Sequence, residues 1–256
     1  MPLFDTHAHY NDNAFNRDRE SLLDALPDAG VGAVVIPGVD VESSRSALAL
    51  AESRPWLFAA VGFHPEDCAG CTDGDFDTIR DLCRSEKVVA IGEIGLDYYW
   101  AENPPKEFQQ RVFRRQLQMA LELDLPVIVH EREAHEDALQ VLSEFPEVTG
   151  VFHCYSGSAE MAGLLVSKGW YIGFTGVITF KNARKLVETA LAIPLDRMVI
   201  ETDCPYMAPE PFRGRRNDPG YLYRMAERLA ELRGVTPEAM QEITTANGKR
   251  LYRLSE

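Results

Sequence analysis

Five of the six histidines in this sequence stand where a short apolar segment ends. The first such segment begins at Leu3 and runs into His7 and His9. Because alternate side chains of a β-strand point to the same side, these two imidazoles are expected to face one way. A His-x-His pair occurs by chance in many sequences, but two convergent imidazoles can begin a metal site. Later segments of the same form end in His64, Glu93, His130, His153 and Asp203.

These residue types predict a site for divalent metal ions. One histidine in a protein core is ordinary, whereas packing alone explains five at strand ends poorly. Imidazoles and carboxylates suit Zn²⁺, Mn²⁺ or Mg²⁺, and the set is large enough for two ions. Glu93 is expected to bridge them, since its strand lies near the middle of the series and Gly92 and Gly95 leave room for close approach. The predicted metal ligands are His7, His9, Glu93, His130, His153 and Asp203.

Asp203 and Glu93 are the predicted catalytic residues. Asp203 is the best candidate to orient or deprotonate a water molecule, because a carboxylate can serve as ligand and base; a plain ligand is the alternative. His64 stands outside the predicted ligand set. It is expected to contact a substrate phosphate, to deliver a proton, or to form a hydrogen bond behind the ligands. Arg132, just past His130, would either contact substrate or pair with a carboxylate.

Arg213, Arg215 and Arg216 form the densest basic cluster of an acidic chain. Their loop follows Asp203, so it is expected to lie over the site, where guanidinium groups could clamp phosphates. A solvated loop is the alternative.

Three aromatic residues follow Glu93, namely Tyr98, Tyr99 and Trp100. Aromatic side chains in such a loop could stack on nucleic-acid bases. Packing of the loop explains them equally well.

Eight apolar segments alternate with helical patterns, which predicts a TIM (β/α)8 barrel. Near-continuous apolar strands imply a sheet covered on both faces, and alternation with helices implies parallel pairing. In such a barrel the catalytic groups stand at the carboxyl ends of the strands. A doubly wound sheet is the weaker alternative, because no Gly-rich phosphate fingerprint follows the first strand. The later strands are expected at 32–36, 58–64, 88–93, 126–130, 150–153, 170–174 and 198–203.

Length and charge limit the classes of protein that fit. A chain of 256 residues suits one barrel domain, expected over 1–256. The net charge of -14 argues against a protein that coats nucleic acid through bulk electrostatics, so such a substrate would need metal ions or a local basic patch. No leader or membrane span is recognisable, which predicts a cytoplasmic protein without a membrane partner. No obligate protein partner is indicated.

Several motifs in order resemble the signatures of the TatD-type metal-dependent deoxyribonucleases. The resemblance runs from Phe4 to about Leu251. The chain departs from these signatures at two places: Tyr155 stands where Phe is frequent, and acidic residues flank Arg132. Both departures concern substrate preference. The motifs are Asp5-Thr6-His7-Ala8-His9, Gly92 to Tyr99, Phe152 to Ser158, and Glu201 to Tyr206 followed by Arg213 to Asn217.

The resemblance implies a TIM barrel with two divalent ions and a DNA substrate. By motif, one ion falls to His7, His9 and Asp203, and the other to His130 and His153. Glu93 would bridge them. The expected activity is hydrolysis of phosphodiester bonds in DNA, from an end of a single strand.

Two other functions stay open from the sequence. A D-aminoacyl-tRNA deacylase, or another amidohydrolase-type hydrolase of esters or amides, could use the same metal pair to activate water against a carbonyl. A catalytically idle binding protein of Tat export or DNA repair is the alternative that is not an enzyme. The complete ligand set argues against it.

Overall fold

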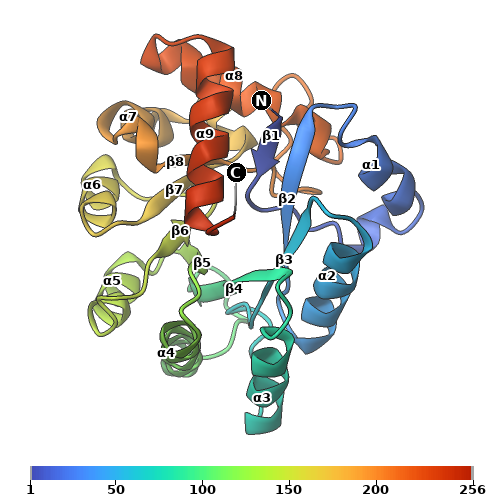
Figure 1. The fold of residues 1–256 in the computed structure, drawn as a ribbon. Helices are drawn as coiled ribbons and strands as arrows, with labels where there is room; N and C mark the ends of the chain where they lie inside the picture. Colours follow the sequence, from blue (N-terminus) through green and yellow to red (C-terminus); the bar gives the residue numbers. More distant parts are fainter. Residues whose placement is uncertain (1, 255–256) are drawn as a thin grey trace. The chain divides into compact units, whose positions relative to one another are not determined.

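The computed structural model describes residues 2–254, in which strands and helices alternate along the chain (Figure 1). The strand order of the sheet follows the sequence, and the strand pairs β1–β2, β3–β4, β4–β5, β5–β6 and β7–β8 are parallel. This is the predicted TIM (β/α)8 class. The strands are β1 (Leu3–Asp5), β2 (Val31–Pro37), β3 (Leu57–Val61), β4 (Val88–Asp97), β5 (Val127–Arg132), β6 (Gly150–Phe152), β7 (Tyr171–Phe174) and β8 (Met198–Ile200).

Nine α-helices lie within the described residues, and none of them is long and apolar enough to cross a membrane. Short 3-10 turns stand at Asn13–Phe15, Gly176–Thr179, Leu195–Arg197 and Pro219–Tyr221. The α-helices are α1 (Arg19–Ala25), α2 (Val41–Ser53), α3 (Asp73–Leu82), α4 (Lys106–Leu123), α5 (His135–Ser143), α6 (Ala159–Ser167), α7 (Arg184–Ala192), α8 (Tyr223–Arg233) and α9 (Pro237–Leu251).

The chain divides into two compact units. Within the described residues, unit 1 comprises 2–35 and 153–254, and unit 2 comprises 36–152. The single domain over 1–256 stays a prediction.

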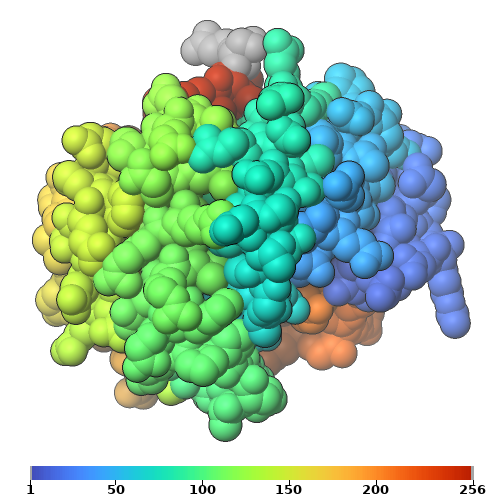
Figure 2. Space-filling view, turned by 90° about the horizontal axis from the view of Figure 1, so that it is seen from below, coloured from blue at the N-terminus to red at the C-terminus, as the bar shows by residue number. Residues whose placement is uncertain are grey.

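Unit 2 contains the parallel strands β3 to β6 and the helices α2 to α5. All residues of β4 are buried, as expected for a strand covered on both faces. Two capping boxes begin helices: Asp40 caps α2 and Thr72 caps α3. Helices α3 (teal) and α4 (green) lie side by side on the face in Figure 2, where an Arg115–Asp73 ion pair joins them at 2.6 Å.

Several predicted strand ends were wrong. Strand β4 continues past Glu93 to Asp97, because Leu96 and Asp97 pair with residues of β5, which itself extends past His130 to Arg132. Conversely, β3, β6 and β8 end before the functional residue that follows each of them.

In unit 1, α9 lies against β1 and β8 (Figure 1). Thr236 caps this helix, with Pro237 at its first position, as the sequence predicts for such a start. The Asn247 amide donates to the carbonyls of Leu195 and Met198, at 2.8 and 2.6 Å. The Tyr252 hydroxyl donates to the carbonyl of Thr6 at 2.9 Å. Helix α9 therefore fixes the two strands that precede His7 and Asp203.

Replacing Gly248 by Ala should destabilise unit 1 by about 1–3 kcal/mol, because a Cβ there would lie 2.7 Å from the ring of Phe4. Gly163, in exposed α6, has no atom within 4 Å of such a Cβ. Gly163→Ala should therefore be neutral or stabilising by about 0.5–1 kcal/mol. Urea unfolding measures both; equal destabilisation of the two variants would contradict the close packing of α9.

Candidate metal centre

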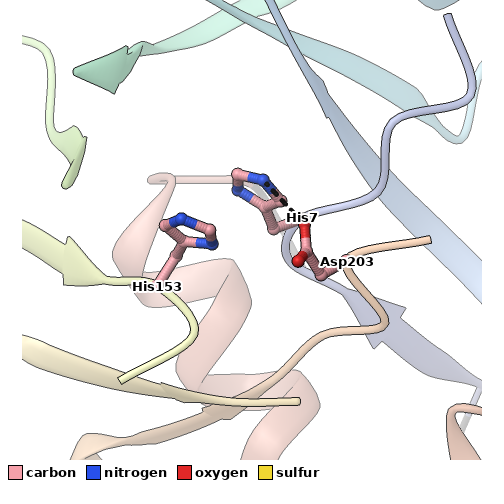
Figure 3. A group of neighbouring side chains, drawn as sticks. All are labelled: His7, His153 and Asp203. Carbon is pink, nitrogen blue, oxygen red and sulfur yellow. Dashed lines mark ion pairs between the residues drawn. The ribbon is translucent and has the colours of Figure 1, made fainter. Parts of the chain in front are cut away.

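In unit 1, His7, His153 and Asp203 offer ligand atoms that all lie within 4.8 Å of one another (Figure 3). Asp203 Oδ1 lies 3.6 Å from His7 Nε2 and 3.5 Å from His9 Nε2. The rings of His7 and His153 stack, with their centroids 4.1 Å apart. These donors are buried or nearly so, and they come from the segments after β1, β6 and β8. Imidazole and carboxylate donors converging at such distances fit a divalent ion.

A buried carboxylate joins the two segments that carry His7 and Asp203. Asp5 accepts hydrogen bonds from the Thr202 hydroxyl (2.6 Å), the Thr202 amide (3.0 Å) and the His7 amide (3.3 Å). The amide of Asp203 in turn donates to the carbonyl of His7 at 2.9 Å. Asp203 has φ 53°, a left-handed conformation that Asp adopts more readily than most residues. These bonds turn the Asp203 side chain towards the imidazoles.

Glu201 lies beside the third member of this group, His153. Its fully buried carboxylate accepts a hydrogen bond from the Cys154 amide and lies 3.7 Å from His153 Nδ1. A Cβ at Gly173 would lie 2.7 Å from its Oε1, so the neighbouring strand needs glycine there. A carboxylate behind a ligating histidine fixes the ring orientation and raises its basicity.

Burial sets the proton affinities of these carboxylates. It raises the pKa of Asp5 to about 7 and that of Glu201 to about 8. Burial also acts on Asp203, but a hydrogen bond from His9 and the charges of nearby histidines outweigh it and lower the pKa of this group. Asp203 is therefore held as the anion, the form that ligates a cation.

In unit 2, His64, Glu93 and His130 form a second group of ligand atoms within 4.8 Å. Glu93 Oε1 lies 3.1 Å from His130 Nδ1 and 3.5 Å from His64 Nε2. The other ring nitrogen of His130 lies 2.9 Å from Asp97 Oδ2. Asp97 is fully buried, and it also accepts a hydrogen bond from the Tyr99 amide at 2.9 Å.

The two histidines of this group differ in their proton affinity. Burial disfavours the charged form of His130, but hydrogen bonds to Asp97 and Glu93 outweigh it and raise its pKa to about 9. Burial and the charge of His130 lower the pKa of His64. The group thus holds one imidazole as a cation between carboxylates, a place that a metal cation would suit.

Two buried glutamines of α4 hold the backbone around this second group. Gln116 accepts from the amide of Phe63 at 2.7 Å and donates to its carbonyl at 3.0 Å, directly before His64. Gln109 makes the same pair of bonds with Asp97, both 2.9 Å long. Helix α4 therefore fixes the ends of β3 and β4 through side-chain amides.

Gln116→Leu should destabilise the protein by about 1–3 kcal/mol, because the buried amide and carbonyl of Phe63 would lose their partners. It should also weaken Mn²⁺ binding, since His64 follows Phe63. Gln118→Leu, on the exposed side of α4, should change neither property. Thermal unfolding and Mn²⁺ titration measure the two effects. A Gln116 variant that matches the Gln118 variant in both would disprove the positioning role.

The structure brings the predicted ligands together within each unit. It groups His7, His9, His153 and Asp203 in unit 1, and His130 with Glu93 in unit 2. The division of these ligands between two ions, with Glu93 as the bridge, stays a prediction.

The sequence predicts His64 outside the ligand set, whereas the structure places it among the potential ligands of unit 2. Three buried carboxylates, Asp5, Asp97 and Glu201, also contact the site in ways that the sequence did not predict. A signal for two of them was present: Asp5 and Glu201 each stand two residues before a predicted ligand, on the same side of an extended segment.

Two of the three arginines in the loop at 213–216 make contacts that the sequence did not reveal. Arg216 makes a two-oxygen ion pair with Asp18, at 2.6 and 2.8 Å. The Arg213 guanidinium lies 4.3 Å from the centre of the Phe180 ring. Arg215 is exposed and makes no ion pair within residues 2–254. In unit 2, Arg132 lies over Tyr99, with 3.7 Å between guanidinium carbon and ring centre.

Fold and site together define a metal-dependent hydrolase of the TIM-barrel class. The family model "TatD related DNase" matches residues 4–253, and the chain belongs to the TatD family.

Named relatives cover almost the whole chain. It is 44% identical over 255 residues to the uncharacterized metal-dependent hydrolase YabD of Bacillus subtilis, covering 99% of this chain and 100% of YabD. It is 35% identical over 257 residues to the 3'-5' ssDNA/RNA exonuclease TatD of Salmonella typhimurium, with 98% of each covered. The crystal structure of YJJV, a TatD homologue from Escherichia coli, superposes with a TM-score of 0.92 at 33% identity, covering 99% of this chain and 98% of that one.

Proposed function

We propose that this member of the TatD family is a nuclease that shortens single-stranded DNA from an end by metal-dependent hydrolysis. The observation that carries the proposal is the convergence of buried imidazoles and carboxylates within each unit. The substrate follows from similarity to a relative named as a 3'-5' ssDNA/RNA exonuclease. The family match over 4–253 supports one hydrolase domain over 1–256. The cytoplasmic location stays a prediction.

Different residues of the chain have different roles in the proposed hydrolysis. Divalent ions held by the two groups of imidazoles and carboxylates would polarise a phosphoryl oxygen and lower the pKa of water. Asp203 takes up the proton of the attacking water, because its carboxylate is held as the anion among His7, His9 and His153. Asp5 and Thr202 hold that carboxylate in place through the backbone. In unit 2, Asp97 orients the His130 ring.

Binding of the DNA phosphate backbone requires positively charged side chains. This acidic chain has them only in local clusters. Arg213 and Arg215 stand on an exposed loop in the same unit as Asp203. We assign them to phosphate contact, since guanidinium groups bind phosphates bidentately. Arg216 is already engaged with Asp18, and we assign it to support of the loop.

The purified protein should bind about two divalent ions. His130→Ala should reduce this content to about one, because His130 stands between Glu93 and Asp97 in the unit 2 group. His135→Ala is the matched control, since His135 is a partly exposed histidine outside both groups. Elemental analysis after dialysis counts the ions. The same metal content in the two variants would contradict the assignment of His130.

Asp203→Asn should keep the fold and most of the metal but lower kcat by roughly 10²–10⁴-fold. Asparagine tolerates the left-handed backbone and coordinates through its oxygen, yet it cannot take up a proton. Circular dichroism, metal content and rate should be compared with those of Asp196→Asn, an exposed position on the turn before β8. A rate near that of the parent protein would show that Asp203 is not the base.

The substrate is tested with end-labelled single-stranded DNA and Mn²⁺ or Mg²⁺. We expect stepwise shortening that EDTA stops. Arg213→Ala/Arg215→Ala should raise KM for DNA and reduce its salt dependence, since fewer counterions are released on binding. Arg228→Ala, which removes an ion pair with Glu231 in α8, should leave both unchanged. Rapid cleavage of a D-aminoacyl-tRNA without DNA shortening would replace the nuclease by a deacylase.

A further inference from the structure

Two large aromatic side chains of unit 2 are exposed side by side. Tyr99 is 45% and Trp100 44% exposed, and their rings meet edge to face with centroids 4.6 Å apart. A single exposed apolar residue is ordinary, but a pair of large aromatic rings in contact with solvent is characteristic of a binding surface. Packing of the loop therefore covers only part of each side chain.

A guanidinium group completes this surface. The guanidinium carbon of Arg132 lies 3.7 Å from the ring centre of Tyr99 and 5.4 Å from that of Trp100. Arg132 makes no ion pair within the described part of the chain. Its charge is held by the aromatic face, at a distance typical of a cation–π contact, and is available to an anion.

The loop that carries these rings is fixed by hydrogen bonds. The side chain of Asp97 accepts from the Tyr99 amide at 2.9 Å and from the Asn103 amide group at 3.1 Å. The Tyr98 hydroxyl donates to Asp137 at 2.8 Å, so Tyr98 is turned towards α5. A surface held in this way loses little conformational entropy when a ligand binds.

The same residues connect the surface to the potential metal ligands of unit 2. Asp97 approaches His130 through its second oxygen, at 2.9 Å. Arg132 follows His130 by two residues on β5, and its backbone stands opposite that of Asp97 in the register of β4 and β5. A polymer with its phosphate at His130 would thus pass close to both rings.

We propose that Tyr99, Trp100 and Arg132 form a stacking site for an unpaired nucleobase of single-stranded nucleic acid, with Arg132 facing the adjoining phosphate. The site deepens the proposed nuclease function and rests on it. Flat π faces and one accessible cation match the alternation of base and phosphate along a single strand. The bases of a duplex are stacked on one another and are not available to such a surface. An aliphatic ligand would make no particular use of ring geometry.

The test compares variants that keep or remove the rings. Tyr99→Phe/Trp100→Phe keeps both π faces, whereas Tyr99→Leu/Trp100→Leu keeps apolar side chains without them. The metal-loaded proteins are titrated with a nuclease-resistant phosphorothioate oligothymidylate and with an abasic oligomer of equal length. Binding is followed by the anisotropy of a labelled oligomer. Hydrolysis of bis-nitrophenyl phosphate, which has no base, reports separately on the metal centre.

We expect the parent protein and the Phe variant to bind the oligothymidylate more tightly than the abasic oligomer, by roughly 5- to 150-fold for one stacked base. The Leu variant should bind the two oligomers equally and still hydrolyse the small phosphodiester. Stacking should also quench the fluorescence of exposed Trp100, and this quenching should be absent from the Phe variant. Trp170, which is buried, should not respond.

The outcomes separate this site from the proposed function. Equal binding of the two oligomers by the parent protein, with the small phosphodiester hydrolysed, overturns the stacking site and leaves the hydrolase. A Leu variant that keeps the preference for bases likewise places stacking elsewhere. If the base preference is present and depends on the rings, but unmodified DNA is not shortened, the stacking site stands and the nuclease proposal fails.

Discussion

The structure depends on one electrostatic constraint, the burial of carboxylates beside imidazoles. Asp5, Glu93, Asp97, Glu201 and Asp203 are all buried. An isolated buried charge is very unfavourable, so each such group must be hydrogen-bonded, protonated or paired with a cation. Backbone amides and the Thr202 hydroxyl satisfy Asp5, and histidines approach the others. Divalent ions would neutralise what remains of the negative charge.

The same constraint explains why the surrounding fold is so closely specified. Glutamines of α4 bond the backbone beside His64 and at Asp97, and Asn247 of α9 bonds the start of β8. Each of these side chains bonds backbone groups at or near the end of a strand, where the sheet ladder begins or stops. Ligands at strand ends are thereby placed by rigid elements, which is what metal binding with little reorganisation requires.

The sequence predicted the fold class and the main candidate residues because both follow from short-range patterns. Apolar strands alternating with helices define the barrel class, and the His residues stand at or just beyond those strands. It did not predict the end of β4, because the pairing with β5 shifts between Ile91 and Ile94, and such a shift leaves no mark in the residue pattern. The role of Asp97 was not predicted for the same reason, since it ends the part of β4 beyond this shift. The ion pair of Arg216 with Asp18 joins residues far apart in the chain, so local charge clustering could not reveal it.

The proposed hydrolase requires a divalent ion at each of the two groups of imidazoles and carboxylates. Crystals grown with Mn²⁺ and measured at the manganese absorption edge test it most directly. We expect anomalous peaks within coordination distance, about 2–2.3 Å, of His7 and Asp203 in unit 1 and of Glu93 and His130 in unit 2. A map that lacks the peak at one or both groups, from crystals of folded protein grown at saturating Mn²⁺ concentration, would contradict this requirement.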